Sequence, residues 1–267
     1  SQNNMIGLLF GDTNFPKKIL DKVKKLNKKY FIIDLSKKRN FKSDKNSHFI
    51  SIGQFGKIIS LIKEKKCNKI LFAGKIDKPK FTSLKLDFKG LYYMPRIIKA
   101  SKLGDAAILR EIIAILLIEK IKVISSNEFN PELSLLKGNY TKLKPNINDL
   151  ESIKKGIRLL SQINAYNHVQ GLVIQNSKIV AKETSKGTKR MLNLLKKYKN
   201  SECILIKFPK KKQDLRVDLP TIGLDTLKDC KKAKIKGIAL KAKRNIFMDK
   251  IKCISFANRN NIFITVR

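Results

Sequence analysis

The sequence predicts an α/β protein, with a Rossmann-like, parallel-sheet N-terminal domain and a mixed α/β C-terminal domain. The chain has 267 residues, more than one compact domain usually contains. In the first half, short continuous apolar runs alternate with segments whose apolar residues recur at helical spacing. Strands that alternate with helices form parallel sheets with right-handed crossovers. A hairpin pattern in the second half favours a mixed sheet there.

The first strand is predicted at Met5–Phe10, a continuous apolar run that stops at Gly11. Pro16 then opens a helix, because proline is favoured in the first helical turn. The same alternation continues to about residue 125. Further strands are expected at 30–35, 69–74 and 122–125, and further helices at 56–66 and 104–120.

The domain junction is predicted where this periodicity is lost, over residues 127–149, which contain Pro131 and Pro145. The boundaries are 1–130 for the first domain, 131–148 for a linker and 149–267 for the second domain. Asn148 or Asp149 is expected to cap the helix that opens the second domain. A hairpin at 169–183, a basic helix at 188–198 and a strand at 203–208 are expected to follow.

The charge balance is strongly basic, with 59 lysines and arginines against 21 acidic residues and a formal net charge of +38. Such a charge favours a polyanionic partner: nucleic acid, an anionic membrane face or a phosphorylated ligand. Lysine far outnumbers arginine, whereas proteins that read nucleic acid tend to use arginine for bidentate contacts. A general bias towards lysine at tolerant surface positions explains the charge as well.

The cysteines and histidines do not form a zinc pattern. The four cysteines are isolated in sequence, and His48 and His168 are expected to be ordinary surface or edge residues. Free thiols are typical of a reducing cytoplasm. No apolar run reaches the roughly 20 residues that span a bilayer, and the N-terminus shows no signal-peptide pattern. The protein is therefore expected to be soluble and cytoplasmic.

Two strand ends in the first half are candidate ligand sites. Gly11 and Asp12 lie between a strand and a helix, where backbone N–H groups favour an anion. A tight structural turn explains "GDTNFP" equally well. Gly74 and Lys75 end another strand, at the edge where open α/β sheets bind ligands. Asp105 opens a long helix, where a carboxylate also suits the helix dipole.

The densest polar cluster follows the strand at 203–208. It contains Lys207, Lys210, Gln213, Asp214, Arg216 and Asp218. Cations beside carboxylates suit phosphoryl chemistry, since lysine and arginine neutralise phosphate oxygens while carboxylates hold Mg²⁺ or orient water. A solvated loop with surface ion pairs is the alternative. The apolar setting of Asp218 in "RVDLPTIG" favours a functional role.

Several motifs together resemble the LpxI-type UDP-2,3-diacylglucosamine pyrophosphatases of lipid A synthesis. They are "IGLLFGDTNFP", "FAGKIDKP", "GDAAILR", "QGLVI", "ETSKGTKRML" and "LIKFPKKKQDLRVDLPTIG". The resemblance implies hydrolysis of UDP-2,3-diacylglucosamine to UMP and 2,3-diacylglucosamine 1-phosphate (lipid X), with Mg²⁺ or another divalent metal. It also implies a cytoplasmic enzyme in transient contact with the inner membrane surface, and it leaves a homodimer open.

The resemblance also implies roles for individual residues. Catalytic roles fall on Asp218, Asp214 and Arg216, and metal binding on Asp218, Glu183 and Asp105. Substrate binding falls on Gly11, Asp12, Gly74, Lys75, Gln170, Gly187, Thr188, Lys207, Lys210, Gln213 and Thr221. The chain departs from the family pattern at Thr13, where a glycine is usual, at Lys186 and Lys189, where acids are usual, and at Lys241, Ala242 and Lys243, where "E-A-G" is usual.

Two other functions are compatible with parts of the pattern. The charge fits a non-catalytic module that binds RNA or DNA, but no helix-turn-helix, RRM or zinc-finger pattern is found. Aromatic residues are not interleaved with the lysine runs, as base stacking requires. A nucleotide-sugar or dinucleotide enzyme on the same N-terminal fold is disfavoured because G-x-G-x-x-G is missing. No nucleic-acid partner is therefore expected.

Overall fold

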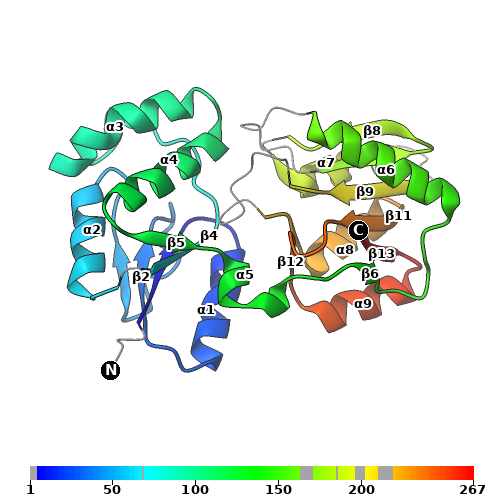
Figure 1. Ribbon diagram of the computed structural model, residues 1–267, viewed down its shortest axis with the longest axis horizontal. Coiled ribbons are helices and arrows are strands. Elements are labelled where there is room, and N and C mark those ends of the chain that lie inside the picture. Colours follow the sequence, from blue (N-terminus) through cyan, green and yellow to red (C-terminus); the bar gives the residue numbers. More distant parts are fainter. Residues whose placement is uncertain (1–4, 68, 163–170, 185, 196–201, 210–218) are drawn as a thin grey trace. The chain divides into compact units, whose positions relative to one another are not determined.

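The computed structural model describes residues 5–67, 69–162, 171–184, 186–195, 202–209 and 219–267. The chain divides into two compact units, Ser1–Asn130 and Pro131–Arg267 (Figure 1). Each unit is an α/β structure built on its own sheet, which confirms the predicted fold class. None of the described helices combines the length and the apolar character that crossing a membrane requires.

The first unit contains a five-stranded, fully parallel sheet in the order β3-β2-β1-β4-β5. Its strands are β1 (Ile6–Phe10), β2 (Tyr30–Asp34), β3 (Ser47–Phe49), β4 (Lys69–Ala73) and β5 (Lys122–Ile124). Its helices are α1 (Phe15–Lys25), α2 (Phe55–Glu64), α3 (Phe88–Ser101), α4 (Asp105–Ile118) and α5 (Ser126–Phe129). The strands predicted to begin at residues 5, 30, 69 and 122 correspond to β1, β2, β4 and β5. The first three are the central strands, and β5 lies at one edge.

The central strands form because their side chains are buried on both faces, which is typical of parallel sheets. β1, β2 and β4 are continuous apolar runs, and nearly every residue in them is buried. Helix α1 has Pro16 in its first turn and buries the stripe Ile19, Leu20 and Val23. The predicted strand, turn and helix at the N-terminus are therefore confirmed.

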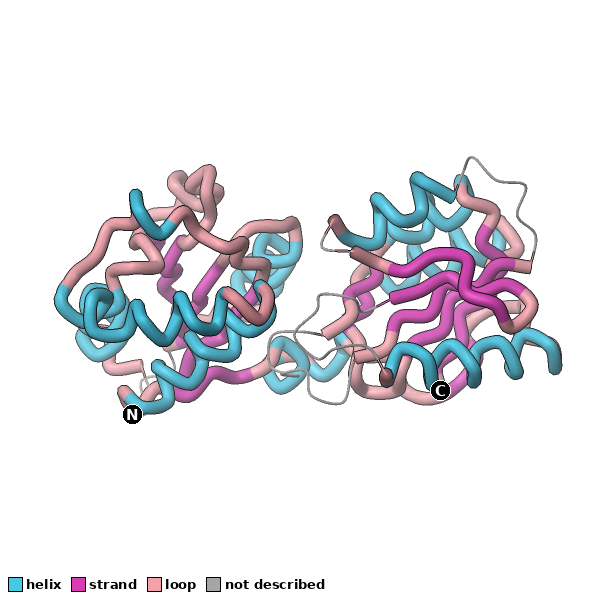
Figure 2. Tube along the Cα trace, turned by 90° about the horizontal axis from the view of Figure 1, so that it is seen from above, coloured by secondary structure: helices cyan, strands magenta, loops and turns pink. Residues whose placement is uncertain are grey.

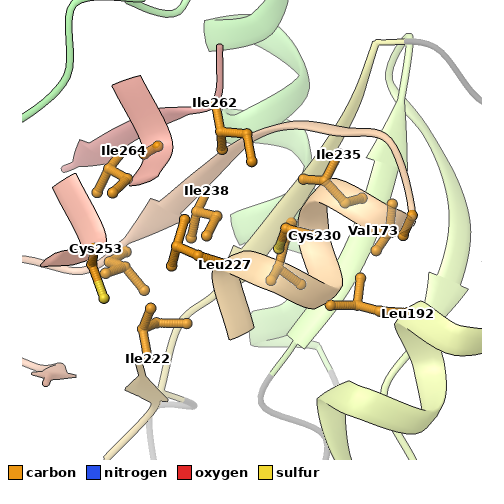
Figure 3. Close-up of a cluster of buried hydrophobic side chains, with 14 of the residues drawn as sticks. Val173, Leu192, Ile222, Leu227, Cys230, Ile235, Ile238, Cys253, Ile262 and Ile264 are labelled. Atoms are coloured by element: carbon orange, nitrogen blue, oxygen red, sulfur yellow. The ribbon is translucent and has the colours of Figure 1, made fainter. Parts of the chain in front are cut away.

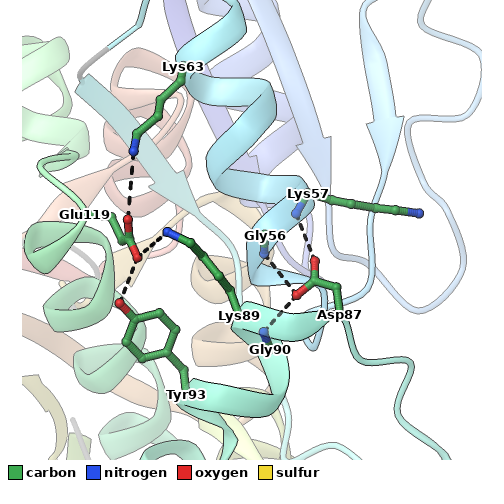
Figure 4. A network of polar contacts seen from close by, with 8 residues as sticks. All are labelled: Gly56, Lys57, Lys63, Asp87, Lys89, Gly90, Tyr93 and Glu119. Carbon is green, nitrogen blue, oxygen red and sulfur yellow. Dashed lines mark hydrogen bonds and ion pairs between the residues drawn. The ribbon is translucent and has the colours of Figure 1, made fainter.

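Helices α2, α3 and α4 are joined by two carboxylates (Figure 4). Asp87 caps α3 by accepting from the Gly90 N–H at 2.8 Å, and it also accepts from the N–H groups of Gly56 and Lys57 at 3.1 and 2.9 Å. Burial raises the pKa of Asp87, but these three N–H groups outweigh it, so the pKa lies below its usual value. The cap therefore ties the start of α3 to the start of α2.

Glu119, just past α4, is the second of these carboxylates. It accepts from Lys89 Nζ at 2.7 Å and from the Tyr93 hydroxyl at 2.8 Å, while Lys63 Nζ lies 3.9 Å away (Figure 4). The hydrogen bond from Lys89 lowers the pKa of Glu119 against the effect of burial. Burial and Glu119 together raise the pKa of Tyr93 to about 12. The three helices are thus fixed to one another by charged hydrogen bonds.

The second unit contains a six-stranded mixed sheet in the order β6-β13-β11-β9-β7-β8. Its strands are β6 (Gly138–Asn139), β7 (Gly171–Gln175), β8 (Lys178–Lys182), β9 (Cys203–Lys207), β11 (Ile235–Leu240) and β13 (Phe263–Val266). β9, β11 and β13 are parallel, while β6, β7 and β8 each pair antiparallel. A separate pair joins β10 (Thr221–Ile222) and β12 (Ile246–Phe247).

Helices cover both faces of this mixed sheet (Figure 2). The helices are α6 (Ile147–Ser161), α7 (Gly187–Leu195), α8 (Leu224–Lys232) and α9 (Lys250–Arg259). Residues on one face of β7 and β9, such as Leu172 and Ile204, pack with Ile153 of α6. Residues on the other face pack with Leu192 of α7, Leu227 and Cys230 of α8 and Cys253 of α9 (Figure 3). Successive side chains of each strand point to opposite faces of the sheet, and they therefore pack into two separate hydrophobic cores.

The second unit differs from the sequence prediction at its start. Residues 131–148, expected to be a linker, supply β6 to the sheet and the buried Leu135 to its core. The cap of α6 is Asn146 rather than Asn148 or Asp149, and Asp149 completes a capping box with it. The predicted hairpin is present as β7 and β8, and its Asn176–Ser177 turn has positive φ at both positions.

Candidate functional site

Three polar residues of the second unit meet at the carboxyl end of β9. Lys207 is the last residue of β9, Glu183 follows β8 directly, and Thr188 lies in the first turn of α7. β7 lies between β8 and β9, and its first residue, Gly171, is in register with Lys207. The carbonyl of Gly171 accepts a hydrogen bond from the Glu183 N–H at 2.9 Å. The strand order therefore brings residues 183 and 207 together across a single glycine.

The side chains of these residues form a hydrogen-bonded chain. Lys207 Nζ donates to Thr188 Oγ1 at 2.7 Å, and the Thr188 hydroxyl donates to Glu183 Oε1 at 3.1 Å. Lys207 is 5% exposed and Glu183 is 7% exposed. Buried charges are retained in folded proteins when they are paired or hydrogen-bonded. We call Glu183, Thr188 and Lys207 the β9 cluster.

Gly171 leaves the room that the β9 cluster occupies. A Cβ atom at this position would lie 2.8 Å from Glu183 Oε2 and 3.4 Å from Lys207 Cγ. Any larger residue would displace the Glu183 carboxylate or the stem of Lys207. Gly171 was not among the predicted site residues, because its role depends on the strand order and leaves no signal beyond a glycine at the start of an apolar run.

Glu183 has one oxygen that the cluster does not use. Oε2 is buried and has no hydrogen-bond partner among the residues that the structure describes. A buried carboxylate oxygen without a protein partner is suited to accept from a bound ion or ligand. Carboxylate oxygens are the ligands that Mg²⁺ prefers. Glu183 therefore fits the predicted role of a metal ligand.

Glu183 does not complete a metal site by itself. Within the described ranges, no group of three or more histidine, cysteine or acidic side chains lies close enough to hold a metal ion. Asp218 lies outside these ranges, and Asp105 begins α4 without a described side chain. The predicted ligand set of Asp218, Glu183 and Asp105 therefore stays a prediction.

The loop before α7 is shaped by a glycine. Gly187 has φ of +86°, a conformation that L side chains rarely adopt, and its N–H donates to the Thr184 carbonyl at 3.0 Å. This turn directs the start of α7, and with it Thr188, towards Lys207. Lys186 and Lys189 are exposed on either side of the turn. The two cations that replace acids in the family pattern therefore lie on the surface and outside the buried chain of hydrogen bonds.

A further cation lies at the same edge of the sheet. Leu240, the last residue of β11, is in register with Lys207, so Lys241 follows β11 at the carboxyl end of the parallel strands. Burial, with the nearby Arg244 charge, lowers the pKa of Lys241. Lys241 was named from the sequence as a departure from the family pattern and was not predicted as a site residue. Its adjacency to Lys207 depends on the pairing of β9 with β11.

The predicted substrate-binding residues of the first unit lie in two turns that contact each other. Asp12 and Lys75 form an isolated bridge, in which the N–H of each donates to the carbonyl of the other at 2.9 Å. A Cβ atom on Gly11 would lie 2.4 Å from the Lys75 carbonyl oxygen, and one on Gly74 would lie 2.5 Å from that of Asp12. Gly74 also has φ of +99°. Close packing between the two turns is therefore enough to explain why both positions are glycine.

The charges at these turns are largely paired. Lys75 Nζ and Lys37 Nζ lie 3.2 and 3.3 Å from the two carboxylate oxygens of Asp77. Burial raises the pKa of Asp77, but the two ammonium groups outweigh it and the pKa is lowered. The Lys37 N–H donates to Asp12 Oδ1 at 3.2 Å. Asp77 and Lys37 were not among the predicted site residues, because their contact joins separate strand ends.

Thr13 adopts an unusual backbone conformation beside these turns. Its φ is +89°, although threonine is β-branched and strongly disfavours positive φ. This is the position at which the family pattern carries a glycine. A cavity of about 470 Å³ opens next to it, with Lys17 and Lys24 among the lining residues. The backbone of a glycine turn is thus retained here with a threonine side chain.

The other predicted site residues can be placed only in part. Thr221 begins β10, and its hydroxyl donates to the Leu219 carbonyl at 3.2 Å, so this group is bonded within its own turn. The remaining predicted residues lie outside the described residues: Gln170, Lys210, Gln213, Asp214, Arg216 and Asp218. Of the residues named from the sequence, the structure brings together Glu183, Thr188 and Lys207, and separately Gly11, Asp12, Gly74 and Lys75.

The fold and the β9 cluster define a two-unit α/β protein with a buried carboxylate and a buried ammonium group, joined by a half-buried hydroxyl, at the carboxyl edge of a sheet. This is the edge at which α/β proteins bind ligands, and the ammonium group suits an anionic one. A family model for the LpxI N-terminal domain matches residues 5–133, and one for the LpxI C-terminal domain matches residues 136–265. The chain therefore belongs to the LpxI family, and the resemblance stated from the motifs is confirmed.

A relative of known name supports this assignment. The chain is 30% identical over 223 residues to the UDP-2,3-diacylglucosamine pyrophosphatase LpxI of Caulobacter vibrioides. The match covers 80% of this chain and 80% of the relative. The similarity therefore extends over both units.

Proposed function

We propose that this protein hydrolyses the pyrophosphate of UDP-2,3-diacylglucosamine, giving UMP and 2,3-diacylglucosamine 1-phosphate. Membership of the LpxI family and the name of the Caulobacter relative support the reaction. The single structural observation that carries the proposal is the buried β9 cluster, with Lys207 bonded through Thr188 to Glu183. The cluster supplies a fixed cation and an unused carboxylate oxygen at one point of the second unit.

Lys207 is proposed to bind a phosphate oxygen of the substrate. Its ammonium group has three donors, and the hydrogen bond to Thr188 uses one of them. Because the ammonium group is almost fully buried, it is held in place before the substrate arrives. A pre-positioned donor stabilises the charge that develops on phosphate oxygens in the transition state.

Glu183 is proposed to act through its unused oxygen, Oε2. With Oε1 fixed by the Thr188 hydroxyl, Oε2 keeps a defined direction and can accept a hydrogen bond or serve as a metal ligand. A divalent cation such as Mg²⁺, when bound, would neutralise phosphate charge and favour ionisation of water. The resemblance adds Asp218 and Asp105 as further ligands, and this remains part of the proposal.

The segment that carries Asp214, Arg216 and Asp218 connects Lys207 to Thr221 and therefore starts at the β9 cluster. We assign the orientation of the attacking water to Asp218, with Asp214 as a second carboxylate of the same segment. Arg216, Lys210 and Gln213 would bind phosphate oxygens. The substrate-binding roles of Gly11, Asp12, Gly74, Lys75, Gln170, Gly187 and Thr221 follow from the family resemblance. A cytoplasmic enzyme in contact with the inner membrane would meet such a lipid-linked substrate.

The test is the release of UMP by the purified full-length chain from UDP-2,3-diacylglucosamine dispersed in detergent. We expect UMP and the acylated sugar phosphate in equal amounts, and loss of both when the metal is chelated. Asp218→Asn should abolish turnover, while Asp225→Asn, at an exposed acid in α8, should leave it unchanged. No UMP from the wild-type protein, or equal turnover in both variants, would contradict the proposal. Salt-sensitive binding to random RNA without UMP release would favour the nucleic-acid module.

A further inference from the structure

Helix α3 exposes an apolar face that nothing in the first unit covers. Phe88, Leu91 and Tyr92 are 93%, 63% and 75% exposed, and their spacing of three and four residues places them on one side of the helix. The opposite side buries Tyr93 and Ile97. Single exposed apolar residues are common, but three adjacent large ones indicate an interaction surface. We call Phe88, Leu91 and Tyr92 the α3 apolar face.

The α3 apolar face is held on a rigid support. Asp87 caps the helix and also bonds to the start of α2, and Glu119 joins Lys89 and Tyr93 to the end of α4 (Figure 4). A Cβ atom on Gly90 would lie 1.6 Å from the Gly53 carbonyl oxygen, so the start of α3 lies directly against that backbone. The three apolar side chains therefore project from an anchored helix and not from a loose end.

The segment that carries this face is strongly basic. Residues 85–103 contain five basic residues and a single acid, Asp87. Two of the five, Lys89 and Arg96, pair with Glu119 and Glu111. The carboxylate of Asp87 is already used by three backbone N–H groups. Lys85, Lys99 and Lys102 are exposed. A surface of large apolar side chains edged by lysine is typical of helices that lie in the headgroup region of anionic bilayers.

We propose that α3 docks the protein on an anionic lipid bilayer, with Phe88, Leu91 and Tyr92 in the boundary between headgroups and acyl chains. Lys85, Lys99 and Lys102 then lie beside the anionic headgroups. A second copy of the chain fits this face poorly, because the two basic rims would repel each other. The inference rests on the proposed function only in that a diacylated substrate resides in a membrane. Vesicle binding is measured without substrate and is independent of turnover.

Tryptophan fluorescence can report the docking directly, because the chain contains no tryptophan. In full-length Phe88→Trp, we expect a blue shift and quenching by brominated acyl chains when vesicles containing phosphatidylglycerol are added. Ile251→Trp, at an exposed residue of α9 in the second unit, is the matched control and should show neither change. An unchanged spectrum for Phe88→Trp, or equal changes at both positions, would overturn the proposal.

Vesicle flotation measures the apolar and the electrostatic contributions to lipid binding separately. Replacing the three apolar residues by glutamine should lower the partition coefficient at least roughly tenfold. Replacing Lys85, Lys99 and Lys102 by glutamine should lower it about a hundredfold at low salt, from about fivefold per lysine. The charge-matched control replaces the exposed residues Lys231, Lys232 and Lys234, and should bind like the wild-type protein.

The remaining outcomes also decide the question. Equal binding of wild type and both α3 variants, or equal losses in the α3 and control variants, would overturn the assignment to α3. A change of oligomeric state in the α3 variants without any vesicle binding would make this face a protein interface and overturn the proposal. UMP release from detergent-dispersed substrate should be unchanged in the α3 variants. Loss of vesicle binding with intact turnover therefore separates this inference from the proposed reaction.

Discussion

Thr188→Val should destabilise the second unit, because valine has the shape of threonine without its hydroxyl. The hydroxyl accepts from Lys207 Nζ at 2.7 Å and donates to Glu183 Oε1 at 3.1 Å, and both partners are almost fully buried. A hydrogen bond to a charged group contributes roughly 1.5–3 kcal/mol. Since the two charged groups can partly relax towards each other, we expect a total loss of about 2–4 kcal/mol in the free energy of unfolding.

Calorimetry of the full-length chain provides the measurement for Thr188→Val. A loss of this size should lower the melting temperature of the second unit by at least roughly 6 °C, and leave the transition of the first unit in place. Thr188→Ser keeps the hydroxyl and is the matched control, with a much smaller expected loss. A melting temperature of Thr188→Val equal to that of the wild-type protein, or no lower than that of Thr188→Ser, would show that the hydroxyl does not join the two charges.

Three further predictions concern the turns, the strand glycine and the caps. Thr13→Gly should raise the free energy of unfolding by about 0.5–1 kcal/mol in urea titrations, since φ of +89° strains threonine; equal or lower stability would contradict this strain. Gly171→Ala should cost about 1–3 kcal/mol, because its Cβ would meet Glu183 Oε2 at 2.8 Å, and unchanged stability would show that the carboxylate moves freely. Asp87 has a lowered pKa in the folded state, so its stabilising contribution is present above its unfolded pKa of about 3.9 and is lost as the pH falls through the folded value. Asp87→Asn should therefore weaken the acid dependence of unfolding of the first unit, and an identical pH profile would refute this assignment.

Much of the fold could be predicted because its strands are locally distinctive. β1, β2 and β4 are continuous apolar runs that end at a turn, and β7 and β8 flank an asparagine–serine turn. β3 and β6 were missed because they have only three and two residues and carry no apolar period. Residues 131–148 were assigned to a linker because the apolar periodicity is lost there and Pro131 and Pro145 interrupt the segment. Their place in the second unit depends on pairing with β13, some 125 residues away.

The sequence indicated which residues belong to the candidate site, but it did not indicate which of them contact one another. Glu183, Thr188 and Lys207 were named from motifs, and their hydrogen bonds arise from the order β8-β7-β9. No local pattern specifies that order, so two residues were not predicted as site residues: Gly171, the register partner of Lys207 on β7, and Lys241, which follows its register partner on β11. Gly11 and Gly74 illustrate the opposite case. For Gly11 the sequence favoured a ligand and a tight turn equally, and for Gly74 it favoured a ligand. The contact between the two turns explains both glycines by packing.

The most direct test of the central claim is the steady-state rate of UMP release by Lys207→Met, compared with the wild-type protein and Lys207→Arg. Methionine fills the buried space without a charge, so a folded variant should lose about a hundredfold or more in kcat, as when a transition-state donor is removed. Arginine restores a cation and should recover part of the rate. A folded Lys207→Met protein that releases UMP at the wild-type rate would show that the β9 cluster does not act on the pyrophosphate.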